Sequence, residues 1–268
     1  MSNSSETFQI PLEAAEIYES RFVPALFAEW APHLVDMADV SPGQSVLDVA
    51  CGTGIVARTA AERVGPSGRV VGLDLNPSML TVAQRVGPDI EWRQGDVAAM
   101  PFSDGSFDAV LCQMALMFFP DPVVALREMG RVAATAGVVG IVVPGSLASQ
   151  PAYGPFVELA ARHAGPDVVS LLSTYWRCGD LDELTSTIEA AGLRLVGSRT
   201  RLGTARFGSV DELVATEVEG TPLIERIDNE TYERIREGAR TVLARYVTES
   251  GALEAPIECH IIVAQPAR

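Results

Sequence analysis

Three carboxylates of this chain, Asp48, Asp74 and Asp96, stand at or just after short segments that are expected to form strands. The segments before Asp48 and Asp74 are hydrophobic, which is typical of strands that are buried on both faces of a sheet. A carboxylate at the end of a buried strand requires a partner, because an unpaired buried charge is costly. Carboxylate oxygens accept hydrogen bonds from hydroxyl and amino groups, so the pattern favours the binding of a polar or cationic ligand.

Two glycines follow the first of these carboxylates in a strand–turn–helix pattern at residues 46–64. Gly52 and Gly54 allow a sharp turn and let a ligand approach the backbone without meeting a Cβ atom. The helix expected at 55–64 would direct its N-terminus toward the occupant of the turn. The pattern therefore predicts a ligand-binding turn, and glycines that serve packing alone are the alternative interpretation.

The second carboxylate, Asp74, lies 20 residues after Gly54. An acidic residue at this distance binds the ribose hydroxyls in nucleotide-binding folds. Residues 52–57 also fit the dinucleotide pattern G-x-G-x-x-G/A, so a nicotinamide cofactor has to be considered. Asp48 opposes a pyrophosphate at the turn, and Asp96 is well placed to accept from an adenine amino group. These residues favour a different nucleoside cofactor but leave both open.

The hydrophobic periodicity predicts strands that alternate with helices. We expect strands at 46–49, 69–74, 90–94, 107–112, 138–143, 193–200 and 257–264, and helices at 55–64, 77–86, 121–132, 156–163, 168–175, 181–191, 210–218 and 230–247. A further helical pattern at 11–38 should be divided in two at Pro24, because a proline ring disfavours continuation of a helix. The alternation indicates an α/β fold with a parallel sheet, in which ligands bind beyond the carboxyl ends of the strands.

We expect one domain over residues 1–268. Its parts are N-terminal helices at 1–40, a ligand-binding core at 41–144, cap insertions at 145–178 and 205–227, and a final helix and strand at 228–268. Of its residues, 47% are hydrophobic, which is sufficient for a substantial core.

The composition excludes several classes of function. The net charge is −15, and all 20 basic residues are arginines, so nucleic acid and anionic membranes are unfavourable partners and lysine chemistry is excluded. The four cysteines and three histidines show no metal-binding spacing, so no metal is expected. No targeting leader or membrane span is predicted, and a cytoplasmic location is expected.

Four motifs in order, at 48–54 (DVACGTG), 72–74 (GLD), 95–97 (GDV) and 101–108 (PFSDGSFD), carry a family resemblance. Over about residues 40–143 the chain resembles the class I S-adenosylmethionine-dependent methyltransferases. It is most similar to the small-molecule branch that includes the ubiquinone/menaquinone-biosynthesis C-methyltransferases. The resemblance implies a Rossmann-like, doubly wound, mostly parallel seven-stranded sheet with helices on both faces and helical cap insertions. It also implies S-adenosylmethionine as cofactor and S-adenosylhomocysteine as product.

The resemblance implies roles for individual residues. Asp48, Ala50, Gly52 and Gly54 would hold the methionine part of the cofactor, Asp74 the ribose, Leu75, Met79 and Val97 the adenine ring, and Asp96 the adenine amino group. Cys112 and Gln113 would face the methionine part. The chain departs from the family at Ala50, at Met117 and Phe118, where histidines are frequent, and at 135–137, where the usual turn is Pro-Gly-Gly.

The implied activity is in-line methyl transfer to a small, apolar or aromatic acceptor, driven mainly by proximity and orientation. No catalytic residue is identified; His163 is the best-placed base, and Tyr18, Tyr153, Tyr175 and Trp176 are candidates for the acceptor pocket. The alternatives are an NAD(P)-dependent oxidoreductase and a non-methylating S-adenosylmethionine-binding protein.

Overall fold

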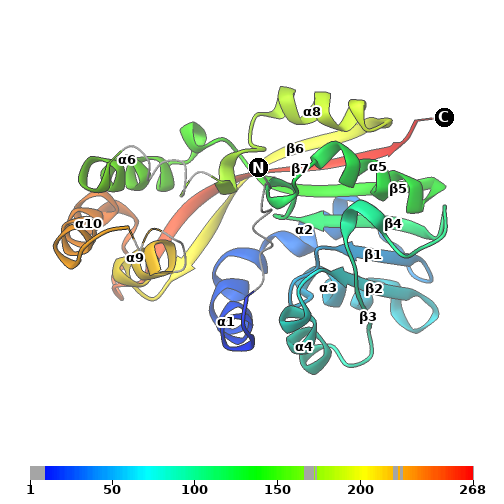
Figure 1. The fold of residues 1–268 in the computed structure, drawn as a ribbon, viewed down its shortest axis with the longest axis horizontal. Helices are drawn as coiled ribbons and strands as arrows, with labels where there is room; N and C mark the ends of the chain where they lie inside the picture. The colour runs from blue at the N-terminus through cyan, green and yellow to red at the C-terminus, as the bar shows by residue number, and fades with distance from the viewer. Residues whose placement is uncertain (1–9, 166–171, 173, 220–222, 224–225, 268) are drawn as a thin grey trace, which may run out of the picture. The chain divides into compact units, whose positions relative to one another are not determined.

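The fold is described here from a computed structural model, which places residues 10–165, 172, 174–219, 223 and 226–267. The chain forms two compact units. The first contains residues 1–143, 181–199 and 260–268, and the second contains residues 144–180 and 200–259. Figure 1 shows the course of the chain and the labels of its elements.

The central element is a seven-stranded sheet with the order β3-β2-β1-β4-β5-β7-β6. The strands are β1 (Ser45–Val49), β2 (Arg69–Asp74), β3 (Glu91–Gln94), β4 (Phe107–Gln113), β5 (Ala133–Pro144), β6 (Leu193–Phe207) and β7 (Leu253–Pro266). Strands β1 to β5 pair in parallel. The expected mostly parallel seven-stranded sheet is thus confirmed.

The order of the strands reverses next to β1. The chain passes from β1 outward to β2 and β3, and then crosses to β4 on the other side of β1. In open α/β sheets, such a reversal opens a crevice beyond the carboxyl ends of the two strands. The crevice here lies where Asp48 and Gln113 end their strands.

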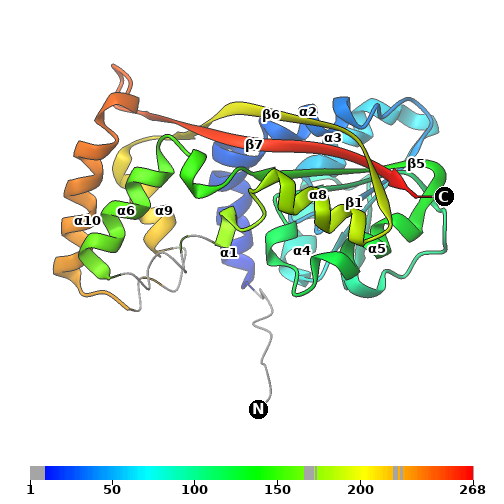
Figure 2. The same cartoon turned by 90° about the horizontal axis from the view of Figure 1, so that it is seen from above.

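Helices cover both faces of this sheet, as expected. They are α2 (Trp30–Met37), α3 (Ile55–Val64), α4 (Pro77–Val86), α5 (Pro122–Val132) and α8 (Leu181–Ala190). Helices α2 and α3 lie on one side, and α5 and α8 on the other (Figure 2). The Asn76 side chain accepts hydrogen bonds from the N–H groups of Ser78 and Met79, and so caps α4.

The expected break at Pro24 is wrong. Helix α1 (Leu12–Ile17) continues into a π-helix, η1 (Tyr18–Phe27), which contains Pro24, and the next α-helix begins at Trp30. In an α-helix the proline ring clashes with the carbonyl group four residues earlier. The π-helix, with its wider i→i+5 turns, carries the chain past the proline without a break.

The described residues of the second unit include three long helices, α6 (Tyr153–Ala164), α9 (Val210–Glu219) and α10 (Asn229–Val242). Gln150, which is 2% exposed, joins two of its segments. Its Nε2 donates to the carbonyl oxygens of Gly145 and Glu258, and its Oε1 accepts from the Glu258 N–H group at 2.9 Å. This paired amide links the start of α6 to strand β7.

Both expected cap insertions, 145–178 and 205–227, lie within the second unit, together with α10. The sixth strand was expected to end at residue 200 but continues to Phe207, so the start of the later insertion is strand rather than cap. The helix expected at 168–175 falls mostly outside the described residues; Thr174–Trp176 form a 3-10 turn. Across the described ranges, no helix is both long and apolar enough to cross a membrane.

Candidate functional site

In the turn after β1, every second residue has a left-handed backbone conformation. Ala50, Gly52 and Gly54 have positive φ angles of 53°, 54° and 88°. This left-handed region is favourable for glycine but strained for Ala50. The Cys51 N–H group donates to the Leu73 carbonyl at 3.0 Å, which fastens the turn to β2. The turn is therefore a rigid, bonded feature at the crevice.

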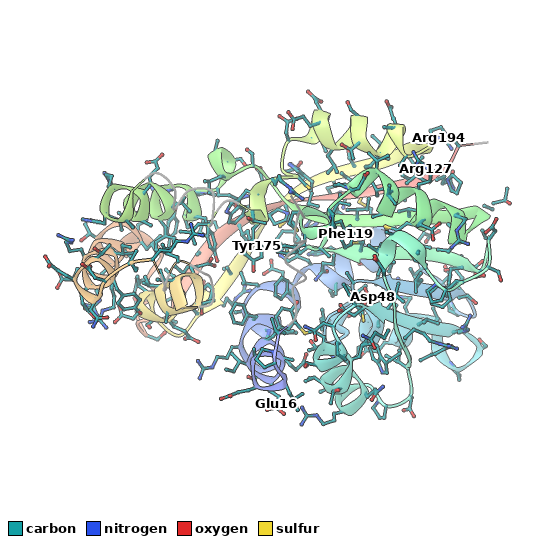
Figure 3. All side chains as sticks on the ribbon, viewed as in Figure 1. Glu16, Asp48, Phe119, Arg127, Tyr175 and Arg194 are labelled. Carbon is teal, nitrogen blue, oxygen red and sulfur yellow. The ribbon has the colours of Figure 1, made fainter. Side chains whose placement is uncertain are left out.

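Asp48, which is labelled in Figure 3, lies at the end of β1 and is 2% exposed. Its Oδ2 accepts a hydrogen bond from the Ala57 N–H group at 2.9 Å. Burial raises the pKa of Asp48 to about 8; the nearby Asp74 raises it further, and the Ala57 bond opposes the rise. Asp48 therefore joins β1 to α3 behind the glycine turn.

The raised pKa predicts that stability falls with rising pH. The folded state binds the Asp48 proton more tightly than the unfolded chain, in which the pKa has its ordinary value of 3.8. This stabilisation is complete below about pH 4 and is lost as the pH rises through about 8. Asp48→Asn keeps the acceptor for Ala57 but cannot ionise. Urea denaturation between about pH 5 and 9 should show a smaller decline for the variant; equal declines would contradict the assignment.

Gly54 makes room for an indole ring. A Cβ atom on Gly54 would lie 2.1 Å from Cη2 of Trp92, and one on Gly72 would lie 2.3 Å from Cζ3 of the same ring. The Trp92 Nε1–H group donates to the Gly87 carbonyl at 2.9 Å. At the Cβ position of Gly54 the structure thus places a side chain from β3, which sequence analysis had not identified as part of the site.

Asp74, at the end of β2, holds the glycine turn from the other side. Its Oδ2 accepts from the Gly52 N–H group at 2.8 Å, and its Oδ1 accepts from the Asn76 N–H group at 2.8 Å. Burial raises its pKa. Leu75, the next residue, is 43% exposed and offers an apolar surface beyond the strand end. Each Asp74 oxygen has a second lone pair that can accept from a ligand hydroxyl.

Asp96 and Val97 follow β3, and Met79 lies in the first turn of α4. Asp96 is exposed, and its Oδ1 accepts from the Ala98 N–H group at 2.9 Å, which caps the 3-10 turn η3 (Val97–Ala99). Val97 and Met79 are half-buried. A planar apolar ligand could contact such half-buried side chains while Asp96 binds its polar edge.

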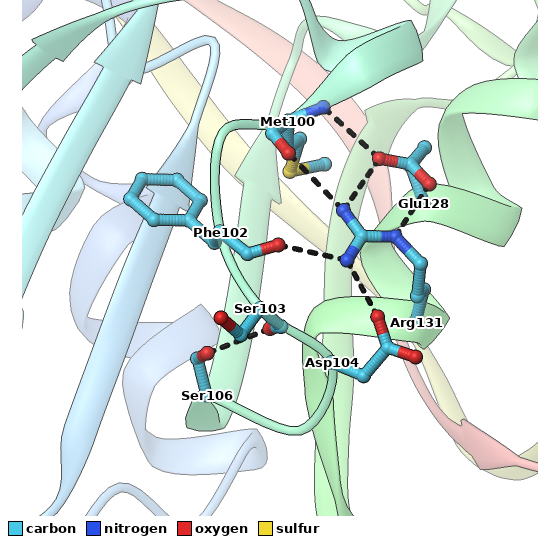
Figure 4. A network of polar contacts seen from close by, with 7 residues as sticks. All are labelled: Met100, Phe102, Ser103, Asp104, Ser106, Glu128 and Arg131. Atoms are coloured by element: carbon cyan, nitrogen blue, oxygen red, sulfur yellow. Dashed lines mark hydrogen bonds and ion pairs between the residues drawn. The ribbon is translucent and has the colours of Figure 1, made fainter.

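The loop after this turn is held by Arg131 of helix α5 (Figure 4). Its guanidinium donates to the carbonyl oxygens of Phe102 and Met100 at 2.8 and 3.1 Å. It also binds Asp104 at 2.8 Å and Glu128 at 2.7 Å, and Glu128 accepts from the Met100 N–H group. The Glu128/Arg131 pair, missed by sequence analysis, thus fixes the segment that follows Asp96.

At the end of β4, Cys112 is fully buried and Gln113 is half-buried. The Gln113 Nε2 group donates to the Phe27 carbonyl at 2.9 Å. Its Oε1 is buried and, among the described residues, accepts no hydrogen bond. Met114 follows with a positive φ of 51°, a conformation that clusters at functional sites. Such a buried oxygen is available to accept a hydrogen bond from a ligand or an ordered water.

Of the four acceptor-pocket candidates, Tyr18 belongs to the first unit, where its ring would be 3.6 Å from a Cβ atom on Gly52. Tyr153, Tyr175 and Trp176 belong to the second unit; the Tyr153 and Trp176 rings lie 5.0 Å apart, and burial raises the pKa of both tyrosines. Glu217, close to Tyr153, has its pKa raised to about 7 by burial. His163, by contrast, is exposed in the last turn of α6.

The chemistry of these residues fits a cationic amino-acid nucleoside. Most polar groups at the strand ends are hydrogen-bond acceptors, and Leu75 supplies an exposed apolar surface beside them. The Asp74 carboxylate contacts the turn at Gly52, where it would oppose a pyrophosphate. In the part of the chain that the structure describes, no group of three His, Cys, Asp or Glu side chains is placed to hold a metal ion.

Comparisons with known proteins agree with this geometry. Residues 47–141 match the family model described as a methyltransferase domain. The expected family resemblance is confirmed for this segment. The matched segment covers the glycine turn, the three carboxylates and the end of β4.

Two curated relatives show which kinds of protein the matched part of the chain resembles. A demethylmenaquinone methyltransferase of Renibacterium salmoninarum is 41% identical over 47% of this chain and 51% of its own length. The nocamycin O-methyltransferase of Saccharothrix syringae is 41% identical over 53% of this chain and 52% of its own length. The chain thus spans about half the length of the curated relatives it matches.

The fold is shared more widely. A Bacillus halodurans structure provisionally described as a methyltransferase superposes with a TM-score of 0.61 at 21% identity, over 89% of this chain and 99% of that one. At this identity the likeness concerns the fold alone. It confirms the Rossmann-like architecture expected from the sequence.

Proposed function

We propose that this protein transfers a methyl group from S-adenosylmethionine to a small, apolar or aromatic acceptor. The observation that carries the proposal is Asp74, whose carboxylate accepts a hydrogen bond from the Gly52 N–H group of the glycine turn. Its charge favours a sulfonium cation and opposes the pyrophosphate of a dinucleotide. The similarity of residues 47–141 to methyltransferases supports the same cofactor.

Each part of the cofactor has a candidate partner in the first unit. Asp74 would accept from the ribose hydroxyls, Leu75, Met79 and Val97 would contact the adenine ring, and Asp96 would accept from its amino group. Ala50, Gly52, Cys112 and Gln113 would surround the methionine part, while Asp48 and Gly54 would shape the turn from behind. The cofactor supplies an electrophilic methyl group bonded to positively charged sulfur.

The protein then has to align the acceptor with the methyl group of the cofactor and to exclude water from the site. Methyl transfer is an in-line displacement, and correct orientation alone removes much of its barrier. The second unit offers the buried aromatic side chains Tyr153 and Trp176 and the half-buried Tyr175 for an apolar acceptor. The name of one matched relative, a demethylmenaquinone methyltransferase, supports an acceptor of quinone-like character. The net charge of −15 disfavours nucleic acid as a partner, and the four free cysteines fit a reducing, cytoplasmic compartment.

Calorimetry with S-adenosylmethionine, S-adenosylhomocysteine and NADH tests the cofactor. Both sulfur nucleosides should bind, and NADH should not, because the Asp74 carboxylate at the turn opposes its pyrophosphate. Micromolar binding of NADH without either sulfur nucleoside would favour the oxidoreductase instead. Mass spectrometry of acceptor libraries then tests the reaction: a product heavier by one CH₂ group is expected, whereas binding without any product would favour a non-methylating protein.

Asp74→Ala tests the ribose contact. Loss of this acceptor should weaken binding of S-adenosylhomocysteine by about 1–3 kcal/mol, since the ribose hydroxyls would lose a charged partner. This corresponds to an affinity about 5- to 150-fold lower. Because Asp74 also binds the Gly52 N–H group, the thermal midpoint of the variant must be measured beside its affinity. An unchanged affinity would show that Asp74 does not hold the ribose.

A further inference from the structure

The segment 12–27 covers the glycine turn of the first unit, and three contacts place it there. Glu16 pairs with Arg85 at 2.7 Å. The Tyr18 ring lies against Gly52 and stacks on Phe27 with 5.2 Å between the ring centroids. Glu19 pairs with Arg58 at 2.9 Å. The side chains of this covering segment are therefore neighbours of the proposed methionine subsite.

Arg58 connects Glu19 to the turn itself. Its Nη1 donates to the Thr53 carbonyl at 2.6 Å, while its Nη2 donates to the Glu19 Oε1. One guanidinium group thus spans the distance between the Glu19 carboxylate and the backbone of the turn. Because this group is planar and rigid, Glu19 has a defined position beside the turn.

The second oxygen of Glu19 has no donor. Its Oε2 is buried and accepts no hydrogen bond from any residue in the described ranges. Buried carboxylate oxygens ordinarily accept from donors, and leaving one without a donor is costly. Gln113 Oε1 is a second buried acceptor without a donor, and its amide is bound to Phe27 at the other end of η1. The described residues therefore supply no hydrogen-bond donor to either of these two oxygens.

We propose that Glu19 binds the α-ammonium group of the amino-acid part of the cofactor. This inference rests on the proposed function. An ammonium group carries three N–H donors and a positive charge, so it satisfies Glu19 Oε2. Arg58 already offsets part of the Glu19 charge, and the ligand offsets the rest.

The test compares two neutral-sulfur ligands, S-adenosylhomocysteine and 5′-methylthioadenosine, by calorimetry. Only the first has the amino-acid part. Glu19→Gln keeps an acceptor for Arg58 but removes the charge, so it should weaken binding of S-adenosylhomocysteine about tenfold and leave that of methylthioadenosine unchanged. Glu16→Gln, on the same covering segment but paired with Arg85, is the matched control and should leave both affinities unchanged.

Other outcomes overturn the inference. If Glu19→Gln leaves S-adenosylhomocysteine binding unchanged, or weakens both ligands equally, then Glu19 only fastens the covering segment. Arg58→Gln tests the second explanation, because it breaks the ion pair but keeps the Glu19 carboxylate. The resulting loss of affinity should be similar for the two ligands. If the natural protein binds neither ligand, the proposed function itself fails, which is a different result from a loss confined to the variant.

Discussion

Gly54→Ala is expected to destabilise the protein by about 2–5 kcal/mol. The variant combines a left-handed backbone, unfavourable by about 1–2 kcal/mol, with overpacking against a rigid indole, which costs about 1–3 kcal/mol. The new Cβ atom would lie 2.1 Å from the Trp92 ring, and φ at this position is 88°. Urea denaturation gives the change in the free energy of unfolding.

Gly192→Ala is the matched control for Gly54→Ala. Its φ is 80°, but nothing lies within 4 Å of its Cβ position, so only the backbone contribution of about 1–2 kcal/mol should be seen. Trp92→Ala in the Gly54→Ala background should recover the overpacking part of the loss. Equal losses at Gly54 and Gly192, or no coupling between Gly54 and Trp92, would show that the indole does not require this glycine.

Arg131→Met should destabilise the first unit by about 2–3 kcal/mol, because it leaves Glu128 and the carbonyls of Met100 and Phe102 without their charged donor (Figure 4). Arg131 is 30% exposed, so water compensates for part of the loss. The released loop follows Asp96, so binding of 5′-methylthioadenosine should weaken as well. Thermal unfolding and calorimetry measure the two effects.

Arg127→Met is the matched control for Arg131→Met. Arg127 lies on the same helix, is exposed, and makes no hydrogen bond or ion pair with the residues that the structure describes (Figure 3). Its replacement should change the stability by less than about 0.5 kcal/mol. If both variants lose the same stability and affinity, the contacts of Arg131 with the loop have no special importance.

The sequence predicted the strand ends of the first unit well, for a physical reason. A buried strand in a parallel sheet needs an apolar run, and Asp48 and Asp74 end such runs within one residue of the observed strand ends. The topology then brings these ends together without further information. The fold class and the crevice could therefore be predicted from local patterns.

The sequence did not reveal partners that lie far apart along the chain. The spacing of Gly52 and Gly54 indicated a turn, but not that Trp92 fills the space beside Gly54. Glu128 and Arg131 have the i,i+3 spacing of a helical ion pair, which was the one available signal. That spacing does not reveal which loop the pair binds, because the packing of helix α5 brings the pair and the loop together.

The covering segment was the least predictable part of the site. A π-helix has no distinct hydrophobic period in a window of ten residues, and Pro24 suggested a break. The contact between Tyr18 and Gly52 depends on this helix type, because the type sets which side chains face the turn. Tyr18 was expected near the acceptor, and the structure places it at the turn.

The position of β7 has a consequence for synthesis of the chain. This strand follows β6 along the sequence, yet it lies between β5 and β6 in the sheet. Strand β6 can therefore take its final neighbour only after residues 253–266 have left the ribosome. Until then the growing chain exposes the unpaired edge of β5, a hydrophobic surface prone to aggregation. Correct assembly of this sheet during synthesis thus depends on the arrival of β7.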